Sequence, residues 1–379
     1  MLNKFGDFVS EKITLGIQKE QDISENRVSI VPKDVKTLIK LGIKVFIETN
    51  AGIKSGYSNQ EYVDSGAEVV TELSSKMNIV TSLNAFYNPS SKLMNNNNII
   101  TISDIKTNPS IAEICKKTNI SLFAMELVPR IARAQKLDVL SSQASIAGYR
   151  AGLMAATSLK KYLPLMMTAA GTIPPASILV LGAGVAGLQA IATTKRLGAD
   201  VTGYDIRMAT GEQVKSLGAK FISDEIPDDF ETKGGYAKDQ TQDTKKMQLD
   251  FLKPHIIKSD AIITTAAIPG RKAPILIEKS TVEQMKAGSV IIDLSAPSGG
   301  NCEYTELGEI VNINDVLVHG PKNLPAEMAY DASQVYSKNI LALLELIINK
   351  ETGILDIDLS DEIIDAMLVF ENGKSRLEK

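Results

Sequence analysis

The stretch that decides the fold is residues 176–207, which read ASILVLGAGVAGLQAIATTKRLGADVTGYDIR. A short apolar run at 177–181 is typical of a buried strand, and it stops at the glycine-rich turn GAGVAG of residues 182–187. An apolar helical run follows and ends at Gly198, after which a second short strand leads to Asp205. The order of strand, turn, helix, strand and acid predicts half of a doubly wound α/β domain.

Each glycine of this turn has a mechanical reason to be there. Gly182 permits a tight strand-to-helix turn, Gly184 lets the backbone approach a pyrophosphate, and Gly187 lets the helix pack closely on the strand. The N-terminus of the helix offers unpaired N–H groups and a partial positive charge to phosphates. The spacing therefore predicts a dinucleotide site, and the alternative is a tight turn in the same kind of domain that holds no ligand.

Asp205 and Arg207 bear on which dinucleotide is bound. The carboxylate of Asp205, at the end of the second strand, can accept both ribose hydroxyls and would repel a 2′-phosphate, so NAD is favoured over NADP. Arg207 is the opposing signal, because a nearby arginine can accommodate a 2′-phosphate. Further cofactor contacts are expected from the turn and from the loops at the carboxyl ends of the strands, at Val185, Ala186, Ile206, Thr265, Ala266 and Leu294.

The composition is that of an ordinary globular protein, with 44% apolar and 23% charged residues among 379, enough for two or three domains. The net charge of −4 gives no electrostatic footprint for nucleic acid or an anionic membrane. Cys115 and Cys302 lie far apart and form no C-x-x-C motif, so we expect small buried hydrophobes rather than a zinc site or disulfides. The start of the chain lacks the apolar core of a signal peptide, and no apolar run reaches bilayer length, which predicts a soluble chain.

Residues 13–125 have the pattern of a first α/β unit. Short apolar strands are expected at 13–17, 45–49, 79–83, 99–102 and 121–124, and helices at 33–41, 60–65 and 111–117. The alternation predicts a parallel sheet covered by helices. This half has no glycine fingerprint, so we do not expect it to hold a nucleotide in the same way.

Residues 127–150 read LVPRIARAQKLDVLSSQASIAGYR and combine Arg130, Gln135, Asp138 and Ser141 in one short span. Their hydrophobic residues are spaced for a helix that begins near Asp138. A functional loop and a solvated linker helix between domains both fit this composition, and the residues alone do not separate the two.

The second unit, residues 141–320, contains the glycine turn. After it we expect a helix near 213–217 and strands at 220–222, 261–267, 289–295 and 316–319. Residues 223–246 are long, polar and weakly patterned, and we expect a mobile lid that orders on nucleotide, with Tyr236 touching the cofactor; the alternative is a disordered insertion. Residues 331–350 predict an amphipathic helix, and residues 352–379 an edge element.

Six segments carry a family resemblance. They are RVSIVP (27–32), VPRIARAQ with LDVLSSQASIAGYRA (128–151), MMTAAGTIPPA (166–176), GAGVAGLQAIATTKRLGA (182–199), GGYAK (234–238) and the helix start at 331–333. Together they resemble the alanine dehydrogenase/transhydrogenase superfamily. The similarity is to the NAD(H)-binding domain, carried on a separate alpha subunit, of proton-translocating NAD(P) transhydrogenase.

The resemblance implies two Rossmann-like doubly wound parallel-sheet domains, residues 1–140 with 321–379 and residues 141–320. It implies that this chain holds NAD(H), that a partner domain holds NADP(H), and that a membrane domain conducts protons. Hydride would pass directly between the two nicotinamides in a Re/Si-specific reaction. The resemblance also implies a homodimer on the cytoplasmic face of the inner membrane, held there by its partner subunits.

The resemblance assigns roles to particular residues. The nicotinamide-side residues of the family fall on Arg130, Gln135, Asp138 and Ser141, the tyrosine of its mobile loop on Tyr236, and its ribose-binding acid on Asp205. This favours the functional interpretation of residues 127–150. Two departures put local loop contacts in doubt, namely Pro297 where a glutamate is usual and Glu327 where an arginine is usual.

Two other functions remain open. An alanine dehydrogenase needs a proton acceptor beside the reacting carbon, and a histidine would be expected in the first domain. This chain has only His255 and His319, both in the second unit, and direct hydride transfer needs proximity rather than a base. A non-catalytic NAD-binding subunit is the third possibility, for which an intact set of Arg130, Gln135 and Asp138 would be unnecessary.

Overall fold

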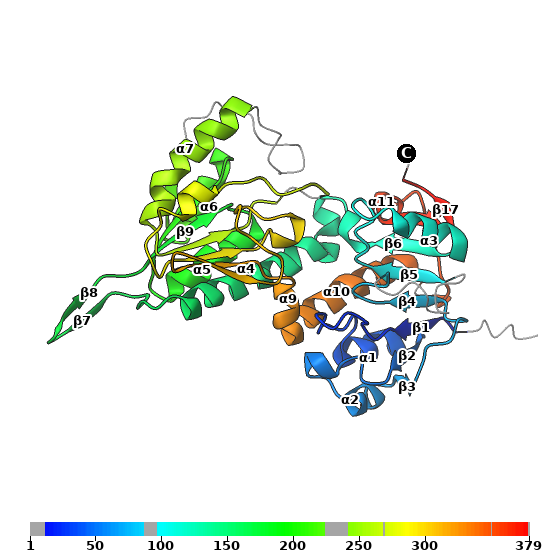
Figure 1. Ribbon diagram of the computed structural model, residues 1–379. Helices are drawn as coiled ribbons and strands as arrows, with labels where there is room; N and C mark the ends of the chain where they lie inside the picture. Colours follow the sequence, from blue (N-terminus) through cyan, green and yellow to red (C-terminus); the bar gives the residue numbers. More distant parts are fainter. Residues whose placement is uncertain (1–11, 87–96, 224–241, 268–269, 350, 378–379) are drawn as a thin grey trace, which may run out of the picture. The chain divides into compact units, whose positions relative to one another are not determined.

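The computed structural model describes residues 12–86, 97–223, 242–267, 270–349 and 351–377. The chain divides into two compact units (Figure 1). Unit 1 is formed by Met1–Ser142 together with Ala329–Lys379, and unit 2 by Gln143–Met328. Unit 2 is therefore inserted, in sequence, between two segments of unit 1.

The sheet of unit 1 has eight strands in the order β17-β16-β6-β5-β4-β1-β2-β3. The parallel strands are β1 (Thr14–Ile17), β2 (Lys44–Glu48), β3 (Glu68–Val70), β4 (Ile79–Thr81), β5 (Asn98–Thr101) and β6 (Ser121–Ala124). Strands β16 (Leu368–Glu371) and β17 (Lys374–Ser375) extend it antiparallel at one edge. The predicted parallel sheet and the predicted edge element are confirmed, whereas β3 was not predicted.

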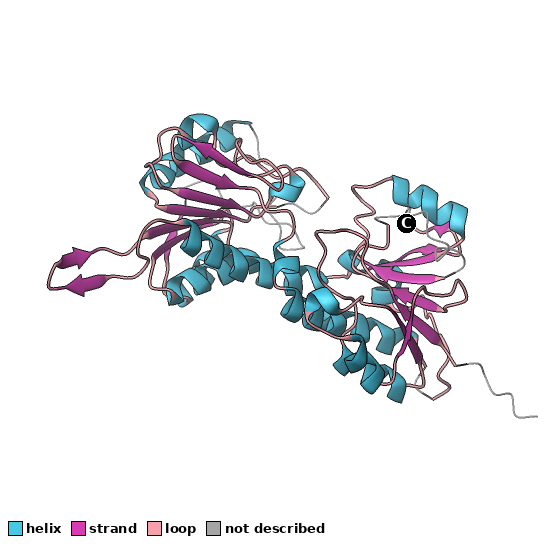
Figure 2. Ribbon diagram, turned by 60° about the horizontal axis from the view of Figure 1, so that its bottom comes forward, coloured by secondary structure: helices cyan, strands magenta, loops and turns pink. Residues whose placement is uncertain are grey.

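Helices cover both faces of this sheet (Figure 2). They are α1 (Pro32–Lys40), α2 (Asn59–Asp64), α3 (Ser110–Thr118), α10 (Ala329–Ile347) and α11 (Glu362–Met367). Pro32 suits the first turn of α1, because its missing N–H has no acceptor there. The apolar stripe of α10 supplies Tyr336, Ile340 and Leu344, all fully buried, to the larger core cluster of unit 1. The predicted amphipathic helix is therefore a core element.

The sheet of unit 2 has seven strands in the order β11-β10-β9-β12-β13-β15-β14. Its parallel strands are β9 (Ser177–Leu181), β10 (Asp200–Tyr204), β11 (Lys220–Ile222), β12 (Ala261–Thr264), β13 (Val290–Asp293) and β15 (Val316–His319). Strand β14 (Ile310–Ile313) pairs antiparallel with β15. The strands wind outward in both directions from β9, so the predicted Rossmann-like, doubly wound fold is confirmed.

Helices of different lengths accompany this sheet. α4 (Val139–Ser158) spans the sequence boundary between the units, followed by α5 (Val185–Arg196), α6 (Gly211–Ser216), α7 (Gln242–Lys258), α8 (Lys279–Val282) and α9 (Leu324–Glu327). α4 begins where the hydrophobic spacing predicts, directly after Asp138. Cys115 and Cys302 are buried free thiols, and burial raises the pKa of each to about 12. No helix in the described part of the chain is long and apolar enough to cross a membrane.

Some sequence expectations were wrong or fall outside the structure. The predicted polar loop at 223–246 ends too late, because residues from Gln242 onward already form α7, which buries Leu252 and Ile256 against the sheet. Tyr236 and the rest of 224–241 lie outside the described residues. The strands predicted at 261–267 and 289–295 end at Thr264 and Asp293, where the chain turns into loops.

A β-hairpin in unit 2 was not predicted. Strands β7 (Met166–Thr168) and β8 (Gly171–Ile173) pair with each other in a separate two-stranded sheet. The hairpin extends away from the seven-stranded sheet of its unit (Figure 1). Met167 is 75% exposed, so the hairpin does not bury its largest apolar side chain within the described unit.

Candidate functional site

The turn between β9 and α5 contains three glycines with three different environments. Gly182 has a φ of +100°, which a side chain rarely adopts. A Cβ on Gly187 would lie 1.8 Å from the carbonyl oxygen of Gly182, so only glycine allows this helix and strand to meet. Gly184 has an ordinary φ of −75°, and a Cβ there would meet no atom of the described residues within 4 Å.

No steric contact with the described residues therefore requires glycine at 184, and the space in front of it is open. This open cradle fits a dinucleotide pyrophosphate, which needs close approach to the backbone. The N–H groups of Val185, Ala186 and Gly187 belong to the first turn of α5 and have no acceptor inside the helix. Val185 is 43% exposed, so this turn faces solvent.

The turn also lies at the topological switch point of the sheet. β9 pairs with β10 on one side and with β12 on the other, and ligands of doubly wound sheets bind in the crevice where the strand order reverses. Thr265, directly after β12, donates its hydroxyl to the carbonyl of Gly182 at 3.1 Å. The structure thus joins the glycine turn to the loop that carries Thr265 and Ala266.

Asp205, directly after β10, is 6% exposed and accepts several hydrogen bonds. Its Oδ2 accepts the N–H of Ala183 at 2.7 Å, which ties the acid to the glycine turn. Its two oxygens also accept from the Nε and NH2 groups of Arg207, both at 2.9 Å. Arg207 is therefore neutralised by Asp205, which weakens its attraction for a 2′-phosphate.

The loops after β12 and β13 are held by two buried residues that the sequence analysis did not single out. The amide of Asn301 donates to the carbonyl of Ala266 at 2.8 Å and accepts the N–H of Ala266 at 3.1 Å. Asp293 accepts the N–H of Asn301 at 2.7 Å and the hydroxyl of Thr264 at 2.8 Å. Leu294 follows Asp293 at the same edge of the sheet. The signal for Asp293 was a charged side chain ending an otherwise apolar strand, whereas Asn301 has no such signal in the sequence.

Unit 1 contains a second candidate site, an open pocket of about 570 Å³. Its lining residues are Gln135, Lys136, Asp138, Ser141, Ser142, Val335, Lys338 and Asn339. The structure thus brings together three of the four predicted nicotinamide-side residues. Arg130 is not among the residues that line this pocket.

Asp138 and Ser141 form one hydrogen-bonded pair at the start of α4. The carboxylate of Asp138 accepts the N–H of Ser141 at 2.9 Å, as an N-cap residue does, and the hydroxyl of Ser141 at 2.6 Å. Since the hydroxyl proton is donated to Asp138, the Ser141 oxygen presents lone pairs to the pocket. The pair therefore suits an amide N–H donor, and the Gln135 amide can both donate and accept.

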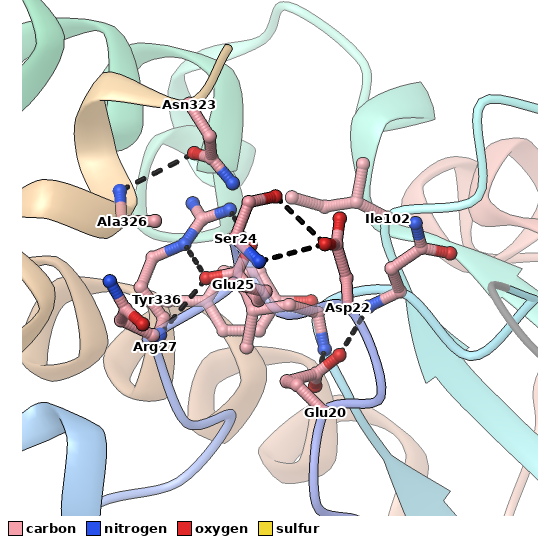
Figure 3. A network of polar contacts seen from close by, with 12 residues as sticks. Glu20, Asp22, Ser24, Glu25, Arg27, Ile102, Asn323, Ala326 and Tyr336 are labelled. Atoms are coloured by element: carbon pink, nitrogen blue, oxygen red, sulfur yellow. Dashed lines mark hydrogen bonds and ion pairs between the residues drawn. The ribbon is translucent and has the colours of Figure 1, made fainter. Parts of the chain in front are cut away.

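A buried ion pair follows β1 in unit 1 (Figure 3). The guanidinium of Arg27 contacts the carboxylate of Glu25 at 2.6 Å, and both side chains are less than a tenth exposed. Glu20 accepts the N–H groups of Leu83 at 2.6 Å and Asn84 at 3.2 Å, and burial raises the pKa of Glu20 to about 7. These groups lie after β1 and β4, the switch point of this sheet. In unit 1, therefore, the Glu20 carboxylate already accepts the backbone N–H groups of Leu83 and Asn84, which an anionic ligand at this position would need.

The two departures and the two histidines lie outside the pocket of unit 1. Pro297 belongs to a short 3-10 turn, Ala296–Ser298, and Glu327 accepts from Nε of Arg150 at 2.7 Å. His255 lies in α7 and His319 ends β15, and burial lowers the pKa of both. Glu327 therefore has a partner of opposite charge within its own unit.

Comparison with known proteins places this fold and these residues in a family. Residues 16–147 match the family described as "Alanine dehydrogenase/PNT, N-terminal domain", and residues 151–378 match "Alanine dehydrogenase/PNT, C-terminal domain". The chain belongs to the alanine dehydrogenase/PNT family.

Within that family the chain is similar to transhydrogenase subunits. A Rhodospirillum rubrum protein, named as the first portion of NAD(P) transhydrogenase subunit alpha, is 41% identical over 370 residues, with 95% of this chain and 96% of the relative covered. The crystal structure of a transhydrogenase from Sinorhizobium meliloti matches with a TM-score of 0.82 and 38% identity, covering 96% of this chain and 98% of that one. An alanine dehydrogenase of Bacillus subtilis is 27% identical over 301 residues, covering 77% of this chain and 73% of the relative. The resemblance expected from the sequence is confirmed.

Proposed function

We propose that this chain is the NAD(H)-binding alpha subunit of a proton-translocating, Re/Si-specific NAD(P) transhydrogenase. The observation that carries the proposal is the pocket of unit 1, in which Gln135, Asp138 and Ser141 come together. These groups can hold an amide-bearing ring by hydrogen bonds. Because the two histidines of the chain lie in unit 2, this pocket has no imidazole base of its own unit. Such a set suits positioning of a ring rather than proton chemistry.

The residues of unit 2 would hold the rest of the cofactor. The N–H groups at the start of α5 would bind the pyrophosphate in front of Gly184, and Asp205 would accept the ribose hydroxyls. Thr265, Ala266 and Leu294 would border the same crevice. NADH, when bound, supplies the hydride that a partner's NADP⁺ accepts. The contribution of this chain would be to exclude wrong orientations of the nicotinamide, because Asp138, Ser141 and Gln135 would hold its carboxamide by hydrogen bonds.

The partner subunits belong to the same proposal. Relatives named as NAD(P) transhydrogenase subunit alpha, whole or as its first portion, support an assembly with further subunits. We propose that these are an NADP(H)-binding domain and a membrane domain that conducts protons. They would hold this chain on the cytoplasmic face of the inner membrane.

A homodimer is also proposed, and the hairpin of β7 and β8 supports it. An isolated two-stranded hairpin is marginally stable in water. Here Leu165, Met167 and Ile173 are 54%, 75% and 39% exposed, so a second copy of the chain could cover apolar surface. Met167→Lys should then shift the chain from dimer to monomer in light scattering after size-exclusion chromatography. A wild-type chain that elutes as a monomer contradicts the proposed dimer.

The test of the proposed reaction uses the full chain mixed with an NADP(H)-binding transhydrogenase subunit. Gln135→Asn and Asp138→Asn should each lower single-turnover hydride transfer strongly, because misplacement on the order of 1 Å can cost about a hundredfold. Affinity for NADH, measured by nucleotide fluorescence, should change far less. Unchanged transfer in both variants would mean that residues 127–150 form only a linker. It would also favour a non-catalytic NAD-binding subunit.

Alanine dehydrogenase is the second candidate, because a solved L-alanine dehydrogenase shares the fold with a TM-score of 0.79 at 23% identity. Unit 1 of this chain contains no histidine, which weighs against the proton abstraction that alanine oxidation requires. An assay with L-alanine and NAD separates the two candidates.

A further inference from the structure

Asn339 lies on α10 and lines the same pocket as Gln135, Asp138 and Ser141. Its side chain is only 6% exposed, and both ends of its amide are bonded. The Nδ2 group donates to the carbonyl of Lys136 at 2.8 Å, and the Oδ1 atom accepts from the hydroxyl of Ser142 at 2.8 Å. Because a carbonyl can only accept, Lys136 fixes which way the amide faces.

The two partners of Asn339 flank Asp138 in the sequence. Lys136 belongs to the 3-10 segment η3 (Ala132–Leu137), which also carries Gln135. Ser142 belongs to the first turns of α4, beside Ser141. A single amide on α10 therefore joins the segment before Asp138 to the segment after it.

Helix α10 is packed tightly into the core of unit 1 and so holds the Asn339 amide in place. Tyr336, Ile340 and Leu343 of α10 are fully buried, and Tyr336 also donates its hydroxyl to the carbonyl of Ser82 at 2.9 Å. The segment that carries Gln135 is irregular by comparison, with three residues per turn and weaker hydrogen bonds. A fixed side chain on α10 is therefore the element against which the pocket residues can be aligned.

We infer that Asn339 is a positioning residue of the nicotinamide pocket, acting through Lys136 and Ser142 on Asp138, Ser141 and Gln135. The inference rests on the proposed function of that pocket. Without the amide, the end of η3 and the start of α4 lose the hydrogen-bonded link that both share, and the ring-side groups shift relative to each other. The glycine turn and Asp205 belong to unit 2 and keep their own contacts. Loss of the Asn339 amide should therefore misorient the nicotinamide ring and leave the affinity for NADH nearly unchanged.

The experiment compares Asn339→Ala with Ser333→Ala in the full chain mixed with an NADP(H)-binding transhydrogenase subunit. Ser333 is a matched control, because it lies on the same helix, is fully buried, accepts the N–H of Val28 at 2.9 Å and bonds Ser55 at 3.1 Å. Neither bond reaches η3 or α4. We expect Asn339→Ala to lower single-turnover hydride transfer by about tenfold to a hundredfold. Its dissociation constant for NADH should stay within about threefold, and Ser333→Ala should change neither quantity by more than about threefold.

Two further readouts distinguish positioning from general destabilisation. Amide hydrogen exchange of the free chain should rise over residues 132–142 in Asn339→Ala and not in Ser333→Ala. The ratio of transfer rates from NADH and from its reduced 3-acetylpyridine analogue, which lacks the carboxamide N–H donors, should change only in Asn339→Ala. Adding Ser142→Ala to Asn339→Ala should cost less than the sum of the two single effects, since both remove the same link.

The outcomes distinguish failure of the Asn339 role from failure of the proposed function of the pocket. Wild-type transfer in Asn339→Ala, or an equal loss in Ser333→Ala, overturns the role of Asn339. If Asp138→Asn still lowers transfer in that case, the proposed function of the pocket stands. If Asp138→Asn leaves transfer unchanged, the proposed function fails and the positioning role fails with it.

Discussion

Replacing Gly184 tests whether the turn after β9 binds a dinucleotide. A Cβ at this position would meet no atom of the described residues within 4 Å, and the φ of −75° is ordinary for any residue. Gly184→Ala should therefore leave folding nearly unchanged. The reduced freedom of the unfolded chain adds about 0.4–1 kcal/mol of stability. Alanine is a poorer N-cap than glycine, and this costs a similar amount. The net change should be within about 1 kcal/mol, or a few degrees in Tm for a unit of this size.

Binding should respond differently. The open space in front of Gly184 is where a pyrophosphate would lie, so a methyl group should weaken NADH binding and the branched side chain of Gly184→Val should abolish it. Each tenfold loss of affinity corresponds to about 1.4 kcal/mol. The matched comparison is Gly187→Ala, whose Cβ would lie 1.8 Å from the Gly182 carbonyl oxygen. That variant should lose about 1–3 kcal/mol of stability as well as binding, because the helix must move off the strand.

The measurements are NADH fluorescence titration and thermal unfolding without nucleotide. Gly184→Val should melt close to the wild type and bind NADH at least about a hundredfold more weakly, a cost of about 2.8 kcal/mol. Wild-type affinity in Gly184→Val would refute the assignment of this turn to the pyrophosphate. A large drop in Tm for Gly184→Ala would show that the turn is packed against something, contrary to the open space at this position.

Three further predictions follow from charges and titrating groups. The wild type should bind NADH more tightly than NADPH, and Asp205→Asn should narrow that preference in fluorescence titrations, because Arg207 loses its partner at 2.9 Å; equal affinities in the wild type would sink the NAD assignment. The isolated chain should not reduce NAD with L-alanine, and measurable turnover would overturn the transhydrogenase proposal. Glu20 has a pKa raised from 4.5 to about 7 by burial, so the folded state holds its proton more tightly than the unfolded chain. Its contribution to stability is therefore present below about pH 4.5 and is lost as the pH rises to about 7. Glu20→Gln should flatten this part of the pH dependence in urea unfolding, and an identical slope in both proteins would contradict it.

The sequence was most informative where one local pattern carried several requirements at once. The GAGVAG turn needs glycine at two positions for internal reasons, and the geometry of Gly182 and Gly187 confirms both. The role of Gly184 toward a pyrophosphate stays a prediction. Short apolar runs and helical patterns also located most strands of both sheets and the long helix α10, but not β3 or β14. The turn, the strands and the helix are determined by residues close together in the chain, so the sequence alone can predict them.

The rest depends on contacts between distant segments. Asn339 bonds Lys136 from about two hundred residues away, and helical periodicity alone marked α10 only as amphipathic. The one signal for Asn339 in the sequence was a polar side chain beside the apolar stripe of α10. The hairpin of β7 and β8 has exposed faces, so its sequence lacks the alternation of apolar and polar residues that marks a half-buried strand. Arg130 was grouped with Gln135 by one short span of sequence and by the family resemblance. It does not line the pocket that residues of η3, α4 and α10 form, and its role stays a prediction.

Because unit 2 is inserted in sequence between two segments of unit 1, the residues of the two candidate sites are synthesised in a fixed order. Everything that forms the glycine turn and its sheet has been synthesised before Ala329. The pocket of unit 1 needs Val335, Lys338 and Asn339, which come later in the chain. A nascent chain halted after Met328 would contain the glycine turn and lack the α10 residues that line the pocket of unit 1. Under the proposed function, the residues that bind the phosphates would therefore be synthesised before all of the groups that orient the nicotinamide.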